Sequence, residues 1–275
     1  GVAAAGAKSL TISGVRNPQV SGSSGVYSVL TTTAADLPID VDSAVTASTI
    51  TPAALTLASV TPASLVAGTT NNVTISFTAT NTIPNLGKIK VTFPAGFNVS
   101  AANGLAATVL PGLTGNWVAS VAGQVVTFTQ SGGGATLAGA QSLTIAGIAN
   151  PQVSGSTGTY TITTTTAGDV AIDTDAAVPA STITAGAITV ASVAPTSLVA
   201  GTTNAVTVSF TSPNPIPNLG KIIVTFPTGF VLGGANGLTA SGLTGLGDGN
   251  WNATVAGQVL TLTQVGGTTV SAAGV

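Results

Sequence analysis

The sequence is short of charge and of reactive side chains. Its 275 residues include five Lys and Arg and seven acidic residues, for a formal net charge of −2, and there is no cysteine, histidine or methionine. All seven acids are aspartate. Soluble proteins usually carry charge on about a quarter of their residues, whereas here the charged fraction is 4%. The surface must therefore consist mainly of Thr, Ser, Asn, Gly and Ala.

These absences exclude several classes of protein. Five cations are too few for a phosphate-binding patch, so we expect no nucleic-acid partner. Without His, Cys or Glu, the common general bases and nucleophiles are missing, and we predict that the chain is not an enzyme and needs no organic cofactor. No apolar run of about 18 residues occurs, which predicts no membrane span. Low charge gives little repulsion between copies, which suits a protein that assembles outside the cell.

A repeat of about 133 residues organises the chain. Four segments return at an offset of 133, and after one inserted residue two more return at 134. The first copies of these segments are Ser9–Ile12, Asn17–Gly22, Ser64–Asn71, Ile83–Lys88, Gly115–Trp117 and Val121–Val125. Matches of this length do not arise by chance, so the repeat is a structural unit.

The phase of the repeat predicts one complete unit between two partial ones. Residues 55–187 form a whole repeat, residues 1–54 match only the closing part of a repeat, and residues 188–275 match only the opening part. The chain is then either a slice of a longer tandem array or a subunit whose partial repeats are completed by neighbouring copies, head to tail. A third interpretation shifts the repeat boundaries to near residue 134.

Alternation of apolar and polar residues predicts strands throughout. Residues 73–78 and 88–93 alternate in this way, and residues 117–129 form a hairpin with a Gly-containing turn. Gly and Pro interrupt the pattern every 8–12 residues or so, and nothing indicates a helix, so the fold class is an all-β sandwich. The aromatic residues recur between repeats and are assigned to the core: Phe77, Phe93, Phe97 and Trp117, with Phe210, Phe226, Phe230 and Trp251.

At these segments the chain resembles the tandem Ig-like repeats of large bacterial and archaeal surface proteins. The resemblance is carried by Ser64–Phe77, Ile83–Phe97, Trp117–Gln130 and Leu143–Tyr160. It implies Ig-like β-sandwich repeats and a secreted stalk, adhesin, surface-layer or filament component. Tyr27 and Tyr160 would then be tyrosine corners, whose hydroxyl groups bond to backbone across the sandwich.

Six of the seven aspartates fall into two copies of one pattern. The pattern Asp-x-x-x-Asp-x-Asp places them at Asp36, Asp40, Asp42, Asp169, Asp173 and Asp175. Residues two apart share a face of a strand, and oxygen-rich clusters suit Ca²⁺, so these aspartates are candidate calcium ligands. The alternatives are a solvated acidic edge that discourages wrong strand pairing and a structural pairing with the recurring Lys88 and Lys221.

Three Asn-x-Ser/Thr triplets are candidate glycosylation sites. They begin at Asn72, Asn98 and Asn252. Glycans would add solubility to a surface with so little charge.

Two functions fit these expectations. The first is a structural component of an extracellular filament, sheath or surface layer, assembled head to tail by β-strand complementation with itself as the partner. The alternative is a stalk segment of a repeat adhesin that presents a ligand-binding domain. Both place the protein outside the cell or at its surface.

Overall fold

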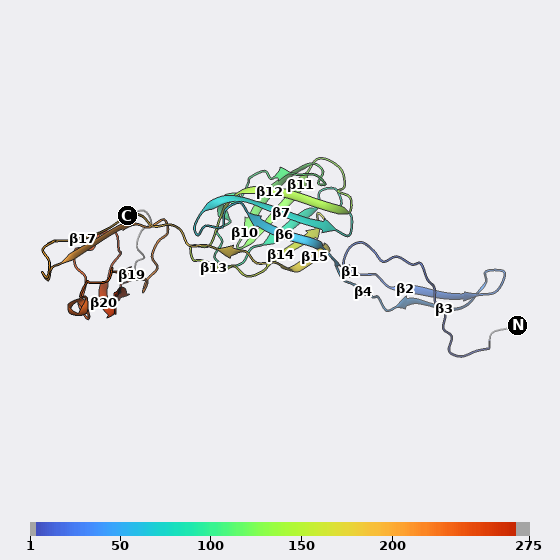
Figure 1. Cartoon of the computed structure of the whole chain (residues 1–275). Coiled ribbons are helices and arrows are strands. Elements are labelled where there is room, and N and C mark those ends of the chain that lie inside the picture. Colours follow the sequence, from blue (N-terminus) through green and yellow to red (C-terminus); the bar gives the residue numbers. More distant parts are fainter. Residues whose placement is uncertain (1–3, 268–275) are drawn as a thin grey trace.

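The computed structural model describes residues 4–267, and it is all-β, as the sequence predicts. Figure 1 shows three modules in a line: an N-terminal arm of paired strands, a central domain and a C-terminal module. We call residues 4–52 the arm, residues 53–187 the central domain and residues 188–267 the open half. The two short 3-10 helices are η1 (Ser100–Ala102) and η2 (Gly233–Ala235). In the described part of the chain, no helix is long and apolar enough to cross a membrane.

The central domain is a sandwich of two sheets. The larger sheet has the order β10–β11–β8–β14–β15–β5, and the smaller has the order β6–β7–β12–β9. The larger sheet is formed by β10 (Asn116–Ala122), β11 (Val125–Ser131), β8 (Lys88–Thr92), β14 (Tyr160–Thr165), β15 (Ala171–Val178) and β5 (Ala53–Ala54). The smaller is formed by β6 (Thr56–Pro62), β7 (Thr70–Ala79), β12 (Gly139–Ala149) and β9 (Thr108–Val109). A short pair, β13 (Gly155–Ser156) with β16 (Thr182–Ile183), lies beside them.

Alternation along the strands builds one core between these sheets. In β7, Val73, Ile75 and Phe77 are buried while the residues between them are partly exposed. The same period of two holds in β8, β11 and β12, because successive side chains of a strand point to opposite faces. The predicted hairpin is confirmed as β10 and β11, joined at Gly123, whose φ of 58° suits a residue without Cβ.

The arm repeats the closing part of the central domain without its surroundings. It contains β1 (Gly22–Ser23), β2 (Tyr27–Thr32), β3 (Pro38–Val45) and β4 (Thr49–Ile50), and β1 pairs with β4 while β2 pairs with β3. Nearly all of its side chains are exposed. Ser21 joins the arm to the central domain, because its N–H and its hydroxyl both donate to Ala171 O at 2.8 Å.

The open half repeats the opening part of the central domain. It contains β17 (Thr189–Pro195), β18 (Val206–Thr211), β19 (Lys221–Thr225), β20 (Asn250–Ala256) and β21 (Val259–Val265). Its two sheets have the orders β17–β18 and β19–β21–β20. Within the described residues, β18 pairs only with β17 and β19 only with β21, so each sheet of this half has an unpaired edge strand.

Leu143 tests whether the buried face of β12 stabilises the central domain. Leu143 is fully buried, whereas Leu137 of the same domain is 72% exposed. We expect Leu143→Ala to lower the free energy of unfolding by about 2–5 kcal/mol, because it removes a packed side chain and leaves a cavity. Leu137→Ala is the matched control and should leave unfolding unchanged in a urea titration followed by circular dichroism. Equal effects of the two variants would contradict this packing.

Candidate assembly site

The arm and the open half are the repeat counterparts of two different parts of the central sandwich. The arm repeats four strands of the central domain: β1, β2, β3 and β4 correspond in order to β13, β14, β15 and β16. The open half repeats five: β17, β18, β19, β20 and β21 correspond in order to β6, β7, β8, β10 and β11. β14 pairs with β8 in the central domain, whereas β2 and β19 lie at opposite ends of the molecule (Figure 1). The central domain therefore shows how the counterparts of the arm and of the open half pair within one sandwich.

An aromatic cluster shows what the open half lacks. In the central domain, Tyr160 is fully buried against Phe93 and Phe97, with ring centroids 5.7 and 5.8 Å away. The counterparts Phe226 and Phe230 keep the mutual 5.4 Å spacing that Phe93 and Phe97 have. No third ring lies on them in the described residues.

A hollow lies beside these two rings. It has a volume of about 210 Å³ and is lined mainly by apolar residues, namely Val193, Pro195, Val224, Thr225, Phe226, Pro227 and Phe230. Phe230 is 44% exposed although its counterpart Phe97 is buried. The sequence-based assignment of Phe230 to the core is therefore wrong within this half, because the segment that would cover it is not part of the open half.

Tyr27 is the arm's counterpart of Tyr160 and is 46% exposed. Its hydroxyl is hydrogen-bonded to Ser48 Oγ at 3.1 Å, as that of Tyr160 is to Ser181 Oγ at 2.9 Å. Side-chain hydrogen bonds with Ser24 and with Ser48 lower the pKa of Tyr27. The tyrosine-corner prediction is corrected in one respect: the partner is a serine side chain, not backbone.

Exposed apolar residues also mark the segment before β1. Residues 6–16 form no strand, and Leu10, Ile12 and Val15 are exposed. Their counterparts Leu143, Ile145 and Ile148 are fully buried on β12, the strand that pairs with β7. The segment carries the pattern of a core strand without a strand partner among the described residues.

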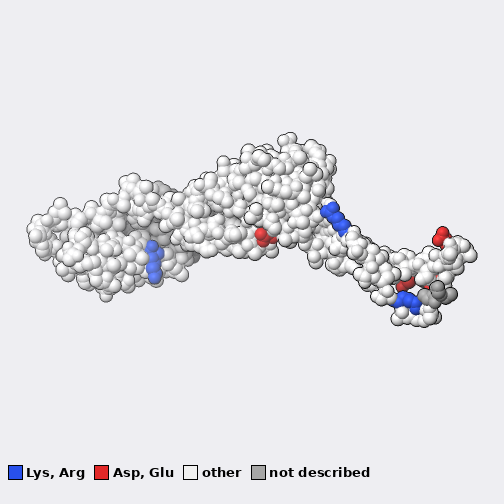
Figure 2. Space-filling model, turned by 45° about the vertical axis from the view of Figure 1, so that its right-hand side comes forward, with Lys and Arg blue, Asp and Glu red and all other residues white. Residues whose placement is uncertain are grey.

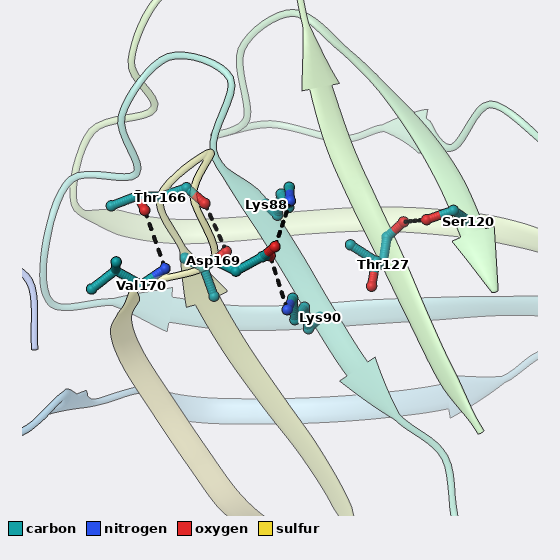
Figure 3. Close-up of polar contacts among 8 residues, drawn as sticks. Lys88, Lys90, Ser120, Thr127, Thr166, Asp169 and Val170 are labelled. Carbon is teal, nitrogen blue, oxygen red and sulfur yellow. Dashed lines mark hydrogen bonds and ion pairs between the residues drawn. The ribbon is translucent and has the colours of Figure 1, made fainter. Parts of the chain in front are cut away.

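The aspartates of the central domain have separate partners. Asp169 lies in the turn between β14 and β15 and forms ion pairs of 2.9 Å with both Lys88 and Lys90 (Figure 3). Asp173 is buried and accepts hydrogen bonds from the N–H of Asn81 at 2.9 Å and its Nδ2 at 2.7 Å. Asp175 accepts one from the N–H of Ala177. Of the alternatives left open by the sequence, pairing with Lys88 is thus confirmed for Asp169.

The arm keeps the local geometry of its aspartates. Asp36 has a φ of 60° and Asp169 one of 65°, in turns closed by the same backbone hydrogen bonds. Asp40 interacts with Thr31, and Asp42 accepts a bond from Ala44 N–H as Asp175 does from Ala177. In residues 4–267, no group of three or more acidic side chains converges as a metal site would require, so the calcium hypothesis stays a prediction without geometric support.

The glycosylation candidates lie at accessible positions. Asn72 on β7 and Asn98 before η1 are exposed, and Asn252 on β20 is half-buried. Asn98 Oδ1 accepts hydrogen bonds from Ser100, and Asn252 Oδ1 accepts one from Thr239 Oγ1. Glycosylation at these residues stays a prediction.

Comparisons with known proteins add no relative. No protein-family model, curated protein or solved structure matches the chain. The resemblance to Ig-like surface repeats therefore stays an expectation. The arm and the open half are compared with their counterparts in the central domain.

Asp169 gives the central domain a dependence on pH. Hydrogen bonds and charge from Lys90 and Lys88 lower the pKa of Asp169 below its ordinary value. The ion pairs therefore stabilise the folded state above the ordinary carboxyl pKa of about 4, and this stabilisation is lost as the pH falls through the lowered value. We expect Asp169→Asn to lower the Tm at neutral pH and the difference from wild type to vanish in acid. A difference that persists unchanged to low pH would contradict this assignment.

Proposed function

We propose that the chain is a structural component of an extracellular filament, sheath or surface layer, in which the arm of one copy completes the open half of the next. The observation that carries the proposal is the pair of matching aromatic sites: Tyr27 exposed on the arm, and the hollow over Phe226 and Phe230 in the open half. Tyr160 on Phe93 and Phe97 is the same arrangement within one domain.

Strand pairing supports the same fit. The register of β14 on β8 sets Ile162 opposite Val91, and the repeat converts this pair to Val29 opposite Val224. In the smaller sheet, the register of β12 on β7 sets Ile145 opposite Val73, which becomes Ile12 opposite Val206. The hairpin β2–β3 would thus extend β19 while residues 6–16 extend β18, so that both unpaired edges are satisfied together.

The few charges agree with this pairing. Lys221 is the counterpart of Lys88, and Asp36 is the counterpart of Asp169. The Lys88–Asp169 ion pair of 2.9 Å would therefore recur between copies as Lys221 with Asp36. Figure 2 shows how sparse such charges are on the surface, which leaves the fit of apolar faces as the main contribution.

The same faces would serve consecutive repeats of a longer chain. In that arrangement, the open half is completed by the repeat that follows it along the polypeptide, and the joints are identical in structure. The 275-residue chain contains both parts of this joint, the arm and the open half. The low charge gives little repulsion between copies, which supports an associating protein.

Lysine substitutions at two adjacent positions of β2, Val29 and Ser28, test the joint, because neighbouring side chains of a strand point to opposite faces of the sheet. We expect the wild-type chain to form polymers that persist on dilution, since release of a strand requires a completed sandwich to open. Val29→Lys should leave the chain monomeric, because the counterpart Ile162 is fully buried. Ser28→Lys should still polymerise, because its counterpart Thr161 is half-exposed. Sedimentation velocity and negative-stain microscopy measure both.

Folding of the variants is checked separately. Val29 is exposed in the arm, so Val29→Lys should leave the urea unfolding of the central domain as in wild type. A wild-type chain that stays monomeric at every concentration would overturn the proposal. Polymers of Val29→Lys indistinguishable from those of wild type would overturn it equally.

A further inference from the structure

The outer surface of the larger sheet carries a polar row in the central domain. Lys90 of β8 lies opposite Thr163 of β14, and Thr163 lies opposite Thr174 of β15. Lys90 pairs with Asp169 at 2.9 Å, and the hydroxyls of Thr163 and Thr174 are hydrogen-bonded at 2.9 Å. Figure 3 shows Lys90 reaching the carboxylate of Asp169 from this side, with Thr127 on the next strand. We call these three positions the outer row.

The arm and the open half change all three positions of the outer row to apolar residues. Lys90 becomes Ile223, Thr163 becomes Leu30 and Thr174 becomes Val41. Leu30 lies opposite Val41 in the β2–β3 pairing, as Thr163 does opposite Thr174. All three are exposed in the described structure, by 64% for Ile223, 51% for Leu30 and 68% for Val41.

The core does not require these changes. The outer row faces away from the space between the sheets, because Ile89, Val91 and Ile162 on the same strands are the buried residues. The neighbouring outer position on β11 keeps its character, with Thr127 repeated as Thr261. Leu30 and Val41 lie in the arm and Ile223 lies in the open half, on the other side of the central domain (Figure 1). Leu30 and Ile223 would become neighbours if β2 paired with β19 in the register that β14 has on β8.

We propose that the outer row determines which half-sandwich accepts the arm. This inference rests on the proposed function, and the partner is a second copy of this chain or the equivalent half of a continuing one. In the joint, Ile223, Leu30 and Val41 cover one another across three adjacent strands. Such cross-strand apolar pairs stabilise strand association, and each good pair changes an association constant by about 1.5- to 5-fold.

The mismatched combinations show how selectivity arises. An arm that displaced β14 and β15 from the central domain of another copy would set Leu30 beside Lys90. A central-domain hairpin placed on the open half would set Thr163 beside Ile223. Neither combination has an apolar pair at this position, whereas the joint has one. The row thus favours polymerisation through the open half over exchange of hairpins between central domains.

A double-mutant cycle on the full chain tests this coupling. The variants are Leu30→Thr, Ile223→Thr and the two combined, which remove the apolar pair without placing a new lysine where Asp36, the counterpart of Asp169, would form an ion pair with it. We expect each single change to lower the urea concentration at which half of the polymer dissociates. The double variant should shift it by less than the sum of the single shifts, because the lost contact is shared.

Controls of the same chemistry accompany the cycle. Leu137→Thr changes an exposed leucine of the central domain, and Val265→Thr changes an exposed position on β21, away from the β19 edge. Both should keep the wild-type midpoint. Two results would overturn the role of the outer row without contradicting polymerisation itself: strictly additive shifts of the urea midpoint, or single variants with the wild-type midpoint. A wild-type chain that never polymerises would overturn the proposed function together with this inference.

Discussion

Closure of a two-sheet sandwich is the constraint on which the rest of this structure depends. Each sheet has an apolar face, and that face is hidden only when the opposite sheet is complete. In the central domain, β12 and the hairpin β14–β15 complete the two sheets, and Tyr160 is fully buried as a result. The same segments in the arm, with nearly the same sequence, leave Tyr27 and Leu10 exposed. Burial here depends on the presence of a partner segment more than on local sequence.

Much of this organisation could be predicted from the sequence, because the repeat and the alternation of apolar residues are strong signals. They predicted the all-β class and the hairpin of β10 and β11, and they included the Lys88–Asp169 pair as one of the alternatives for the aspartate pattern. The partner of Asp173 could not be predicted, since Asn81 lies 92 residues earlier and only the fold brings the two together. The exposure of Phe230 was missed because recurrence identifies a core position without showing whether its cover is present.

The low charge restricts how register can be specified. In most sheets, opposite charges on neighbouring strands help to fix the pairing, but this chain has 12 ionisable Lys, Arg and Asp residues in all. Lys88 and Lys90 are both used on Asp169, at the turn that ends the hairpin. Elsewhere the apolar pattern must fix the register, because a slip by one residue would move every core side chain to the outer face.

The two parts of the arm differ in how far they are prepared for binding. The hairpin β2–β3 already has the bulges and turn of β14–β15, and Tyr27 already contacts Ser48. An isolated two-stranded hairpin is marginally stable, so in the proposed joint association with β19 would add stability to a shape that is already present. Residues 6–16 form no strand, and ordering them on β18 loses backbone entropy at each residue. In the proposed joint, the hairpin would therefore need less reorganisation than residues 6–16, and once docked it would hold that segment close to the edge of β18.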